Sequence, residues 1–322
     1  MSNGVLFLLI AELFFAIGTV IVKIITADTD ITGVELAFLR FLTGFIIIGS
    51  YTIITRRTIK PEKPVFVYMR GFFNALSVIF FFMGVQYSNV SKANLLNMTY
   101  PVFVMLLSPL INKEKNTHSV ILYLTIIMAG IYLIVIPGHS GSGFSDINKG
   151  DIFALMSGIT AGFGISFLRE ARKSNSIHVV LFYLMETGTV ISGIFTASSF
   201  VIPTGIYILY ILIMAVLSFT GQLLITVGYK YIDAAPGSLV SSSRIVFAII
   251  LGVTFFSDPI TLRIIIGSLM IIISLAGVNG FFRYLKREVR SWLRQTKFYL
   301  ILYFFLNLST LPAVSRSFSF LV

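Results

Sequence analysis

The sequence contains no cysteine among its 322 residues. The protein therefore cannot form a disulfide, an iron–sulfur cluster or a thiolate zinc site. Charged residues are also scarce, at 11% of the chain, where a soluble domain has about 25%. Hydrophobic residues take their place, at 57% with a mean hydropathy of +0.94. This composition is typical of a protein that lies mostly in lipid.

Sequence motifs of enzymes are nearly absent as well. The three histidines, His118, His139 and His178, fall in separate loops or at helix ends, without the spacing of metal ligands. No glycine-rich loop ends in Lys-Ser or Lys-Thr, so we expect no ATP hydrolysis by this chain. The Gly-His-Ser-Gly-Ser-Gly run at 138–143 resembles a nucleophile elbow, but no strand precedes it. We predict a protein that is not an enzyme and uses no metal or cofactor.

Ten mostly apolar segments follow one another along the chain. Each is close to the length of about 20 residues that a membrane-spanning helix needs. The first lacks a basic leader and a cleavage pattern, and its apolar run is too long for a signal peptide. We predict an all-α polytopic membrane protein with ten transmembrane helices. Their approximate bounds are 4–25, 33–54, 65–86, 91–111, 118–136, 151–170, 178–198, 206–229, 236–256 and 261–282.

Lysine and arginine gather in the loops on one side of this predicted bundle, which explains the net charge of +11 without a nucleic-acid partner. By the positive-inside rule we expect both termini in the cytoplasm and the protein in the inner (plasma) membrane. Sixteen lie on that side: Arg56, Arg57, Lys60, Lys63, Lys113, Lys115, Arg169, Arg172, Lys173, Lys230, Arg283, Lys286, Arg287, Arg290, Arg294 and Lys297. Four lie on the other: Lys23, Lys92, Lys149 and Arg263.

The two halves of the chain resemble each other. An offset of 146 residues aligns Gly4 with Gly150 and Lys23 with Arg169, and an offset of 144 aligns Gly84 with Gly228. Because each half holds an odd number of helices, the second half must enter the membrane from the opposite side. Two inverted five-helix repeats are typical of transporters that bind their cargo near the midplane, between the halves. The expected domains are a first repeat at 1–136, a flexible linker at 137–150, a second repeat at 151–282, and a basic amphipathic and apolar appendage at 283–322.

Two of the predicted helices are unusually polar. They begin with the stretches 91–103 and 235–247, which occupy matching places in the two halves. Hydrocarbon tolerates polar groups at this depth only where they face protein or a water-filled cavity. Two such helices therefore predict a cavity that both halves share. At the offset of 144, Asn94 matches Ser238, Asn97 matches Ser241, and Tyr100 matches Arg244.

Short motifs recur in the same order in both halves. The first half has Phe38-Leu39-Arg40-Phe41, Arg70-Gly71, Phe82-Met83-Gly84-Val85-Gln86-Tyr87, Ala93, Tyr100-Pro101-Val102-Phe103 and Glu114. The second has Gly228-Tyr229-Lys230-Tyr231, Ala235-Pro236-Gly237 and Asp258. In this order the chain resembles the drug/metabolite transporter superfamily, of the EamA-type ten-helix kind, over roughly residues 4–282. The second half departs from the family pattern, with Asp258 where Glu is usual and Ile245 opposite Pro101.

The resemblance implies a secondary-active transporter that works by alternating access without ATP. Its cargo is expected to be a small polar metabolite, such as an amino acid or another carboxylated compound, moved by uptake or export. The resemblance also implies a central cavity lined chiefly by helices one, three, four, six, eight and nine, with two and seven peripheral. The alternatives are a lipid-carrier flippase-like protein and an intramembrane enzyme or scaffold, because a fold alone does not name its cargo. The expected partners are a small molecule, the lipid bilayer and a second copy in a homodimer.

Five ionisable residues lie at membrane depth and are candidates for function, since burying a charge there is costly. They are Glu12, Arg40, Arg70, Glu186 and Arg244. Arg40 and Glu186 are repeat mates, so they are expected either to form a structural ion pair or to act on cargo or gating. Glu12 has the uncharged Gly158 as its mate and is expected either to carry a proton or to pair with an arginine.

Arg244 and Arg70 are the candidate contacts for an anionic cargo, because a guanidinium group matches a planar oxyanion. The alternative is that they satisfy backbone carbonyls. Five neutral residues are expected to orient the cargo or, alternatively, to bond neighbouring helices: Asn94, Asn97, Tyr100, Gln222 and Ser241. Pro101 is expected to kink its helix, because it removes a backbone hydrogen bond to Asn97.

Overall fold

The computed structural model describes residues 3–88, 90–115, 117–135, 148–198, 200–256 and 262–278, and within them every regular element is a helix. The appendage expected at 283–322 and nearly all of the expected linker lie outside these residues. The helices are α1 Asn3–Asp28, α2 Gly33–Thr55, α3 Pro64–Tyr87, α4 Val90–Asn97, α5 Tyr100–Leu107, the π-helical turn η1 Ser108–Asn112, α6 His118–Val135, α7 Lys149–Ser174, α8 Ile177–Thr196, α9 Ile206–Gly228, α10 Ala234–Ser241, α11 Ser243–Phe256 and α12 Leu262–Val278.

The predicted membrane-spanning character is confirmed. In the described part of the chain, eight helical stretches are long and apolar enough to cross a membrane. Two of these stretches consist of consecutive short helices, Ala93–Asn112 and Ala234–Phe255. Two shorter apolar stretches, His118–Leu133 and Ile265–Ser274, lie where the fifth and tenth helices were predicted. The chain is thus an all-α polytopic membrane protein.

Local sequence signals begin several of these helices. Thr32 and Glu35 form a capping box at the start of α2, in which each side chain accepts a hydrogen bond from the other residue's backbone N–H. Asn148 and Asp151 form the equivalent box at the start of α7. Pro64 lies in the first turn of α3, where its missing N–H costs no helical hydrogen bond.

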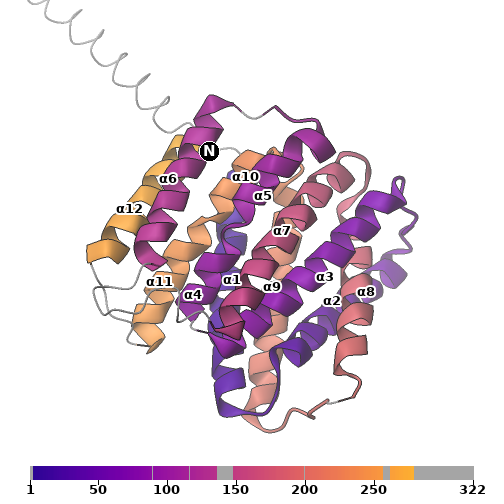
Figure 1. Cartoon of the computed structure of the whole chain (residues 1–322). Coiled ribbons are helices and arrows are strands. Elements are labelled where there is room, and N and C mark those ends of the chain that lie inside the picture. The colour runs from indigo at the N-terminus through magenta and orange to yellow at the C-terminus, as the bar shows by residue number, and fades with distance from the viewer. Residues whose placement is uncertain are drawn as a thin grey trace, which may run out of the picture. The chain divides into compact units, whose positions relative to one another are not determined.

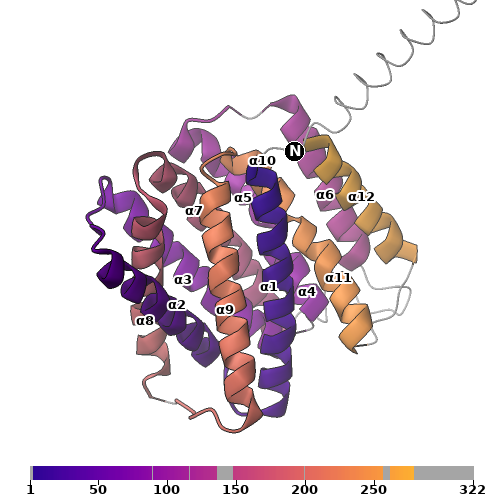
Figure 2. The same cartoon turned by 180° about the vertical axis from the view of Figure 1, so that it is seen from behind.

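The helices pack in a pattern that stays the same when the two halves are exchanged. The most extensive contacts are those of α3 with α7 and of α1 with α9, which lie side by side in Figures 1 and 2 respectively. Exchanging the halves converts the first pair into the second. The exchange likewise converts the contact of α3 with α8 into that of α9 with α2. The contacts of α2 with α8 and of α6 with α12 each join two equivalent helices, so the exchange leaves them unchanged. This packing is what two inverted repeats produce.

Glycines allow the close approach of helices at matching points of these two interfaces. Between α1 and α9, a Cβ atom on Gly4 would lie 3.2 Å from the carbonyl oxygen of Gly228. Between α3 and α7, a Cβ atom on Gly84 would lie 3.0 Å from the Cβ atom of Ala154. Small residues let transmembrane helices gain dispersion contacts that larger side chains prevent.

The polar helix of each half is interrupted at the same place. In the first half α4 ends at Asn97 and α5 begins at Tyr100, and in the second α10 ends at Ser241 and α11 begins at Ser243 (Figure 1). Pro101 lies in the first turn of α5, directly after the first interruption, and the second interruption contains no proline. At both interruptions a side-chain hydroxyl donates a hydrogen bond to a backbone carbonyl of the preceding turn. Thr99 donates to the carbonyl of Leu96, and Ser242 donates to the carbonyl of Ser238. Such bonds compete with the helical backbone pattern.

Candidate functional site

A polar cavity lies between the two halves. It has an empty volume of about 670 Å³, including the part that opens to solvent. Its walls come from α1, α2, α3, α4, α5, α7, α9 and α11. Arg40 of α2 is an addition to the helix set that the family resemblance implied, since that helix was expected to be peripheral. The lining residues are Phe15, Gly18, Thr19, Arg40, Arg70, Asn74, Ser77, Val78, Phe81, Phe82, Asn97, Tyr100, Ala161, Ile165, Ser218, Gln222, Ile225 and Arg244.

Many lining residues are repeat mates of one another, so the cavity lies on the axis that relates the halves. The mated pairs are Phe15 with Ala161, Thr19 with Ile165, Asn74 with Ser218, Val78 with Gln222, Phe81 with Ile225, and Tyr100 with Arg244. In each pair the position is shared and the side chain differs, and in four of the six pairs at least one member is polar. The symmetric frame therefore surrounds a cavity wall that is asymmetric in its side chains.

Three guanidinium groups point into this space, and Arg40 lies close enough to both Arg70 and Arg244 for their charges to repel. The Arg40 guanidinium lies 5.4 Å from the ring centroid of Phe15 and 5.7 Å from that of Phe82. Aromatic faces of this kind attract a desolvated cation. Within the described part of the chain, Arg40 and Arg70 have no carboxylate within ion-pair distance.

Four buried nitrogen donors on the cavity wall have no hydrogen-bond partner among the described residues. They are Arg40 Nε, Arg70 Nε, Asn74 Nδ2 and Gln222 Nε2. Buried donors in proteins are nearly always paired, because an unpaired one loses its hydration without compensation. A cargo rich in hydrogen-bond acceptors would supply the missing partners.

Arg244 reaches the cavity from α11 and is held by Glu12 of α1. Its Nη2 atom lies 2.5 Å from Glu12 Oε2, and its Nε atom donates to the same oxygen at 2.6 Å. The Glu12 side chain is fully buried, whereas that of Arg244 is 11% exposed. The Arg244 guanidinium also lies 4.8 Å from the ring centroid of Phe15. Of the two roles expected for Glu12, the structure shows the pairing with an arginine.

At the matching place in the first half, neutral groups replace the ion pair. Asn97 donates from Nδ2 to the hydroxyl of Ser157 on α7 at 2.7 Å. Gly158, the mate of Glu12, packs directly on the interruption, and a Cβ atom there would lie 2.7 Å from Thr99 Oγ1. The first interruption is therefore closed by tight packing.

The structure does not form the ion pair that was predicted as one alternative for Arg40 and Glu186. Among the described residues the Arg40 guanidinium contacts phenylalanine rings, and Glu186 lies beside Tyr183 on α8. Repeat mates occupy equivalent places, but equivalence about an axis does not bring two side chains into contact.

The remaining predicted residues divide between the wall and the layer behind it. Asn97, Tyr100, Arg70 and Gln222 line the cavity together with Arg244. Asn94 does not, because it is buried and donates to the carbonyl of Val90 within its own helix. Ser241 also lies behind the wall, close to Glu12, Tyr100 and Tyr229.

Phe15 was not predicted, although it contacts two of the arginines. It lies three residues after Glu12 and hence on nearly the same face of α1. That spacing was the one signal available, and it is common in apolar helices. The described residues hold no group of three or more His, Cys, Asp or Glu that could bind a metal.

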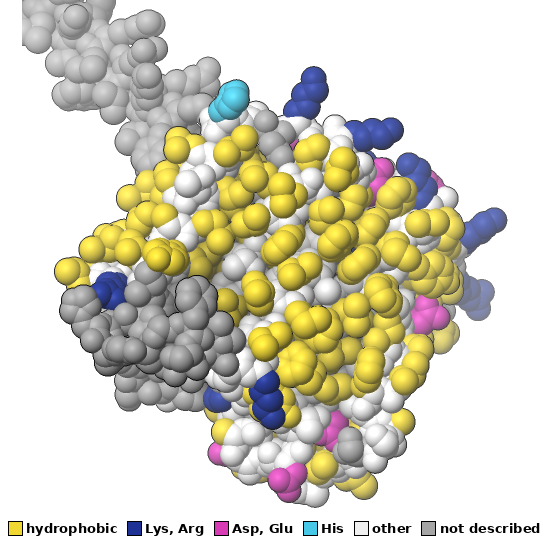
Figure 3. All heavy atoms as spheres, viewed as in Figure 1, with side chains coloured by type: hydrophobic (Ala, Val, Ile, Leu, Met, Phe, Trp, Pro, Cys, Tyr) yellow, Lys and Arg dark blue, Asp and Glu magenta, His cyan; other side chains and the backbone are white. Residues whose placement is uncertain are grey.

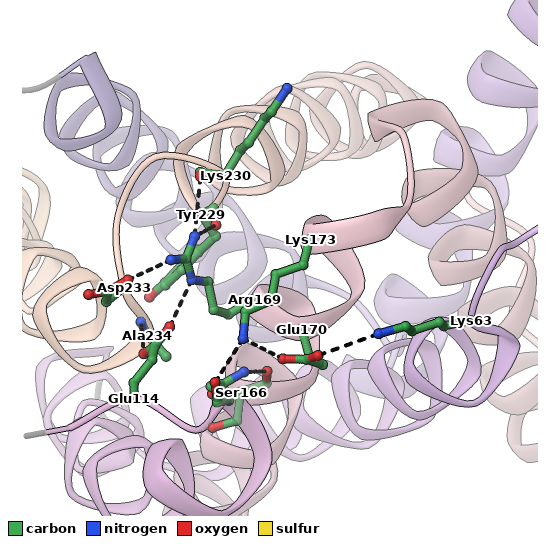
Figure 4. Close-up of polar contacts among 11 residues, drawn as sticks. Lys63, Glu114, Ser166, Arg169, Glu170, Lys173, Tyr229, Lys230, Asp233 and Ala234 are labelled. Atoms are coloured by element: carbon green, nitrogen blue, oxygen red, sulfur yellow. Dashed lines mark hydrogen bonds and ion pairs between the residues drawn. The ribbon is translucent and has the colours of Figure 1, made fainter.

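A second polar cluster closes the end of the bundle at which α2, η1, α7 and α9 end, which we call the basic end. Arg169 of α7 lies at its centre (Figure 4). It donates to Glu114 at 2.8 Å, to Asp233 at 2.5 Å and to the backbone carbonyl of Tyr229 at 3.0 Å. Glu114 in turn accepts a hydrogen bond from the backbone N–H of Ala234, in the first turn of α10. One side chain thus ties together segments of both halves.

Lys23, the repeat mate of Arg169, makes the matching contact at the opposite end. Its Nζ atom donates to the carbonyl oxygens of Val85 and Ser88, where α3 ends. Arg169 likewise donates to carbonyl oxygens where α9 ends, at Tyr229 and Lys230. In each half, therefore, a cation on the first helix donates to carbonyl oxygens at the end of the third helix of the same half.

Comparison with known proteins gives a consistent picture. A model of the EamA-like transporter family matches residues 2–136 and again residues 148–280. The human solute carrier family 35 member G1 is 24% identical over 308 residues, covering 91% of this chain and 81% of the relative. The pseudopaline exporter CntI of Pseudomonas aeruginosa is 22% identical over 275 residues, covering 85% of this chain and 95% of the exporter. A solved crystal structure shares the fold, with a TM-score of 0.69 at 18% identity, covering 88% of this chain and 99% of the other.

Proposed function

This chain belongs to the EamA-like transporter family, and from that premise we propose that its central cavity carries a small carboxylated metabolite, such as an amino acid, across the membrane. The transport is secondary-active and proceeds by alternating access of the cavity to the two sides. The cargo is recognised chiefly by Arg40, Arg70 and Arg244, with Asn74 and Gln222 supplying neutral hydrogen bonds.

The unpaired donors of the cavity carry this proposal. Three guanidinium groups lie at the cavity, and Glu12 supplies one carboxylate, which leaves an excess of two positive charges. Burying unbalanced charge in this way is costly unless a ligand of opposite sign compensates it. A carboxylate accepts two parallel hydrogen bonds from one guanidinium group, which makes it a better match than a neutral or cationic compound.

Transport into proteoliposomes tests the cargo class. We expect competition with a labelled carboxylated substrate by amino acids and organic acids, and none by the same compounds with the carboxylate converted to an amide. The matched variants are Arg70→Gln, which removes a cavity cation, and Lys60→Gln, which removes an exposed cation outside the cavity. Preferential transport of nucleosides or of cationic compounds would contradict the proposal.

The proposed orientation places both termini in the cytoplasm and the protein in the inner membrane of the cell. The side chains of Lys and Arg that gather at the basic end support it (Figure 3). The two units that alternate would be the repeats at 1–136 and 151–282. The homodimer stays a prediction. Since the chain has no cysteine, single variants such as Thr58→Cys and Thr204→Cys can be labelled by an impermeant reagent. In intact cells we expect labelling at position 204 alone.

Coupling to protons is proposed at Glu12. A proton on Glu12 would remove the charge that holds Arg244 and release this arginine for cargo. The titratable groups around Glu12 are Arg244 on α11, Tyr100 on α5 and Tyr229 after α9. We expect Glu12→Gln to remove the stimulation of transport by a proton gradient while exchange of labelled for unlabelled cargo persists. The matched control is Glu62→Gln at the exposed basic end, and an unchanged gradient dependence of Glu12→Gln would exclude this role.

A further inference from the structure

A second, larger hollow lies at the basic end, between α2, α9 and the turn from α7 to α8. Its empty volume is about 1340 Å³, including the part that opens outward, and it shares no lining residue with the central cavity. The residues that line it are Ile47, Ile48, Tyr51, Arg57, Arg172, Lys173, Ser174, Asn175, Ser176, Ile177, His178, Leu181, Phe219, Leu223 and Lys230. We call it the interfacial groove.

The groove has a basic rim and an apolar floor. Its Lys, Arg and His residues lie at the ends of α2, α7, α8 and α9, whereas Ile48, Leu181 and Phe219 lie deeper along their helices. At a rise of about 1.5 Å per residue, Ile48 and Phe219 lie about 10 and 14 Å below these ends. The hydrocarbon layer of one leaflet is about 15 Å thick, half of the hydrocarbon core of the bilayer. The groove therefore spans the depth of a lipid headgroup and most of an acyl chain.

The rim carries more positive charge than its surroundings neutralise. No Asp or Glu lines the groove. Lys173 is paired with Glu170, but Arg57, Arg172 and Lys230 have no ion pair with any described residue. Arg172 is fixed in place because it donates from Nε to the carbonyl of Thr226 at 3.0 Å and from Nη1 to the carbonyl of Asn175. This arrangement presents one cation held by two backbone carbonyls beside two exposed cations.

The side of the groove formed by α2 faces the bilayer. Ile47 is 36% exposed and Tyr51 is 42% exposed, although both lie on a membrane-spanning helix. The guanidinium of Arg57 lies 6.0 Å from the ring centroid of Tyr51. Tyrosine and arginine at this level are typical of the boundary between hydrocarbon and headgroups.

From the charge, the depth and the lateral opening, we propose that the interfacial groove binds an anionic phospholipid. The phosphate would lie between Arg57, Arg172 and Lys230, with one acyl chain against Ile48, Phe219 and Leu223. Basic pockets between transmembrane helices at the membrane surface bind lipids of this class. A neighbouring face of α9, about 100° around the helix, presents Ser218 and Gln222 to the central cavity, so the lipid would contact a helix that also lines the proposed cargo site.

Native mass spectrometry of the purified full chain tests the site. The protein is offered phosphatidylglycerol and phosphatidylcholine with the same acyl chains, in equal amounts. The double variant Arg57→Gln/Lys230→Gln removes two rim cations, and Lys60→Gln/Lys115→Gln removes two exposed cations of the basic end that do not line the groove. We expect the first to bind phosphatidylglycerol about 30-fold more weakly, from two cations near a membrane surface, and the second to bind it as the unaltered protein does. Thermal unfolding of both variants in detergent serves as the check on folding.

A further variant separates a lipid from a water-soluble phosphate. Leu223→Trp fills the apolar floor and keeps every cation, so it should also weaken binding of phosphatidylglycerol. Millimolar inorganic phosphate should fail to displace the lipid. Displacement by phosphate together with normal binding by Leu223→Trp would overturn the proposal in favour of a phosphate site. Equal binding of the two lipids, unaffected by any variant, would overturn it in favour of non-specific lipid contact.

Discussion

The two helix interruptions lie in equivalent places and are stabilised by opposite means. In the first half, Asn97 bonds Ser157, and Gly158 lets α7 pack on the carbonyl groups that the interruption exposes. In the second half, the buried carboxylate of Glu12 pairs with Arg244. The first interruption is therefore stabilised by uncharged groups that pack closely, and the second by an ion pair beside the cavity.

This difference indicates that the two structurally similar halves have different roles. Tight packing on a glycine leaves the two helices little freedom to move against each other, because their atoms are already in close contact. An ion pair in a low-dielectric environment can be broken by a proton or by a competing anion, at an energy that depends on what replaces it. We therefore expect the first interruption to act as a structural support and the second to respond to cargo. Four single substitutions and one double variant test this contrast.

The largest effect is expected from Arg244→Gln. It would remove the charge-assisted contact that we propose between Arg244 and a cargo carboxylate, so transport should fall by about 10- to 100-fold. The variant also leaves Glu12 buried without its cation, which would lower stability as well. Transport rates in proteoliposomes and thermal unfolding in detergent measure the two effects separately.

The double variant Glu12→Gln/Arg244→Gln separates cargo binding from stability. It removes both charges together, so we expect unfolding close to that of the unaltered protein while transport stays low. Full recovery of transport in the double variant would show that Arg244 acts only as the partner of Glu12.

The next largest effect is expected from Gly158→Ala. The added methyl group would lie 2.7 Å from Thr99 Oγ1 and 3.0 Å from the carbonyl oxygen of Asn97, so α7 must move away. Overpacking of this kind costs about 1–3 kcal/mol of stability. The control is Gly49→Ala on α2, where nothing lies within 4 Å of the new atom. Equal melting temperatures for the two variants would contradict the tight packing.

A smaller effect is expected from Asn97→Ala. This variant loses the hydrogen bond to Ser157, and such bonds between transmembrane helices contribute about 0.6 kcal/mol on average. Because Asn97 also lines the cavity, the KM for cargo should rise modestly while the maximal rate is kept. Asn97→Ser, which introduces the residue type of the mate Ser241, should retain part of the bond. A loss as large as that of Arg244→Gln would show that the first interruption also recognises cargo.

The smallest effect is expected from Pro101→Ala. Pro101 lies in the first turn of α5, where proline removes no intrahelical bond, and the second interruption forms without any proline. We expect a change in unfolding free energy below about 1 kcal/mol and nearly normal transport. A large loss of transport would show that proline, and not the Thr99 hydroxyl, maintains the first interruption.

The sequence was sufficient to predict the helices, their repeat and the shared cavity. These features depend on local properties: apolar runs long enough for lipid, an odd number of them in each half, and polar residues at matching depth.

The tertiary structure decided which ionisable groups meet. Arg244 and Glu12 are 232 residues apart, and no periodicity in either helix selects one partner for the other. The matching of Arg40 with Glu186 in the repeat suggested a pair, whereas in the structure Arg40 faces phenylalanine rings and its side chain reaches the cavity. The length of an apolar run is a property of each helix by itself and can be read from the sequence. The pairing of charges depends on how the helices are rotated and packed against one another. The sequence therefore determined that the protein spans the membrane around a polar cavity, and only the packing decided which of the cavity arginines lack a carboxylate partner among the described residues.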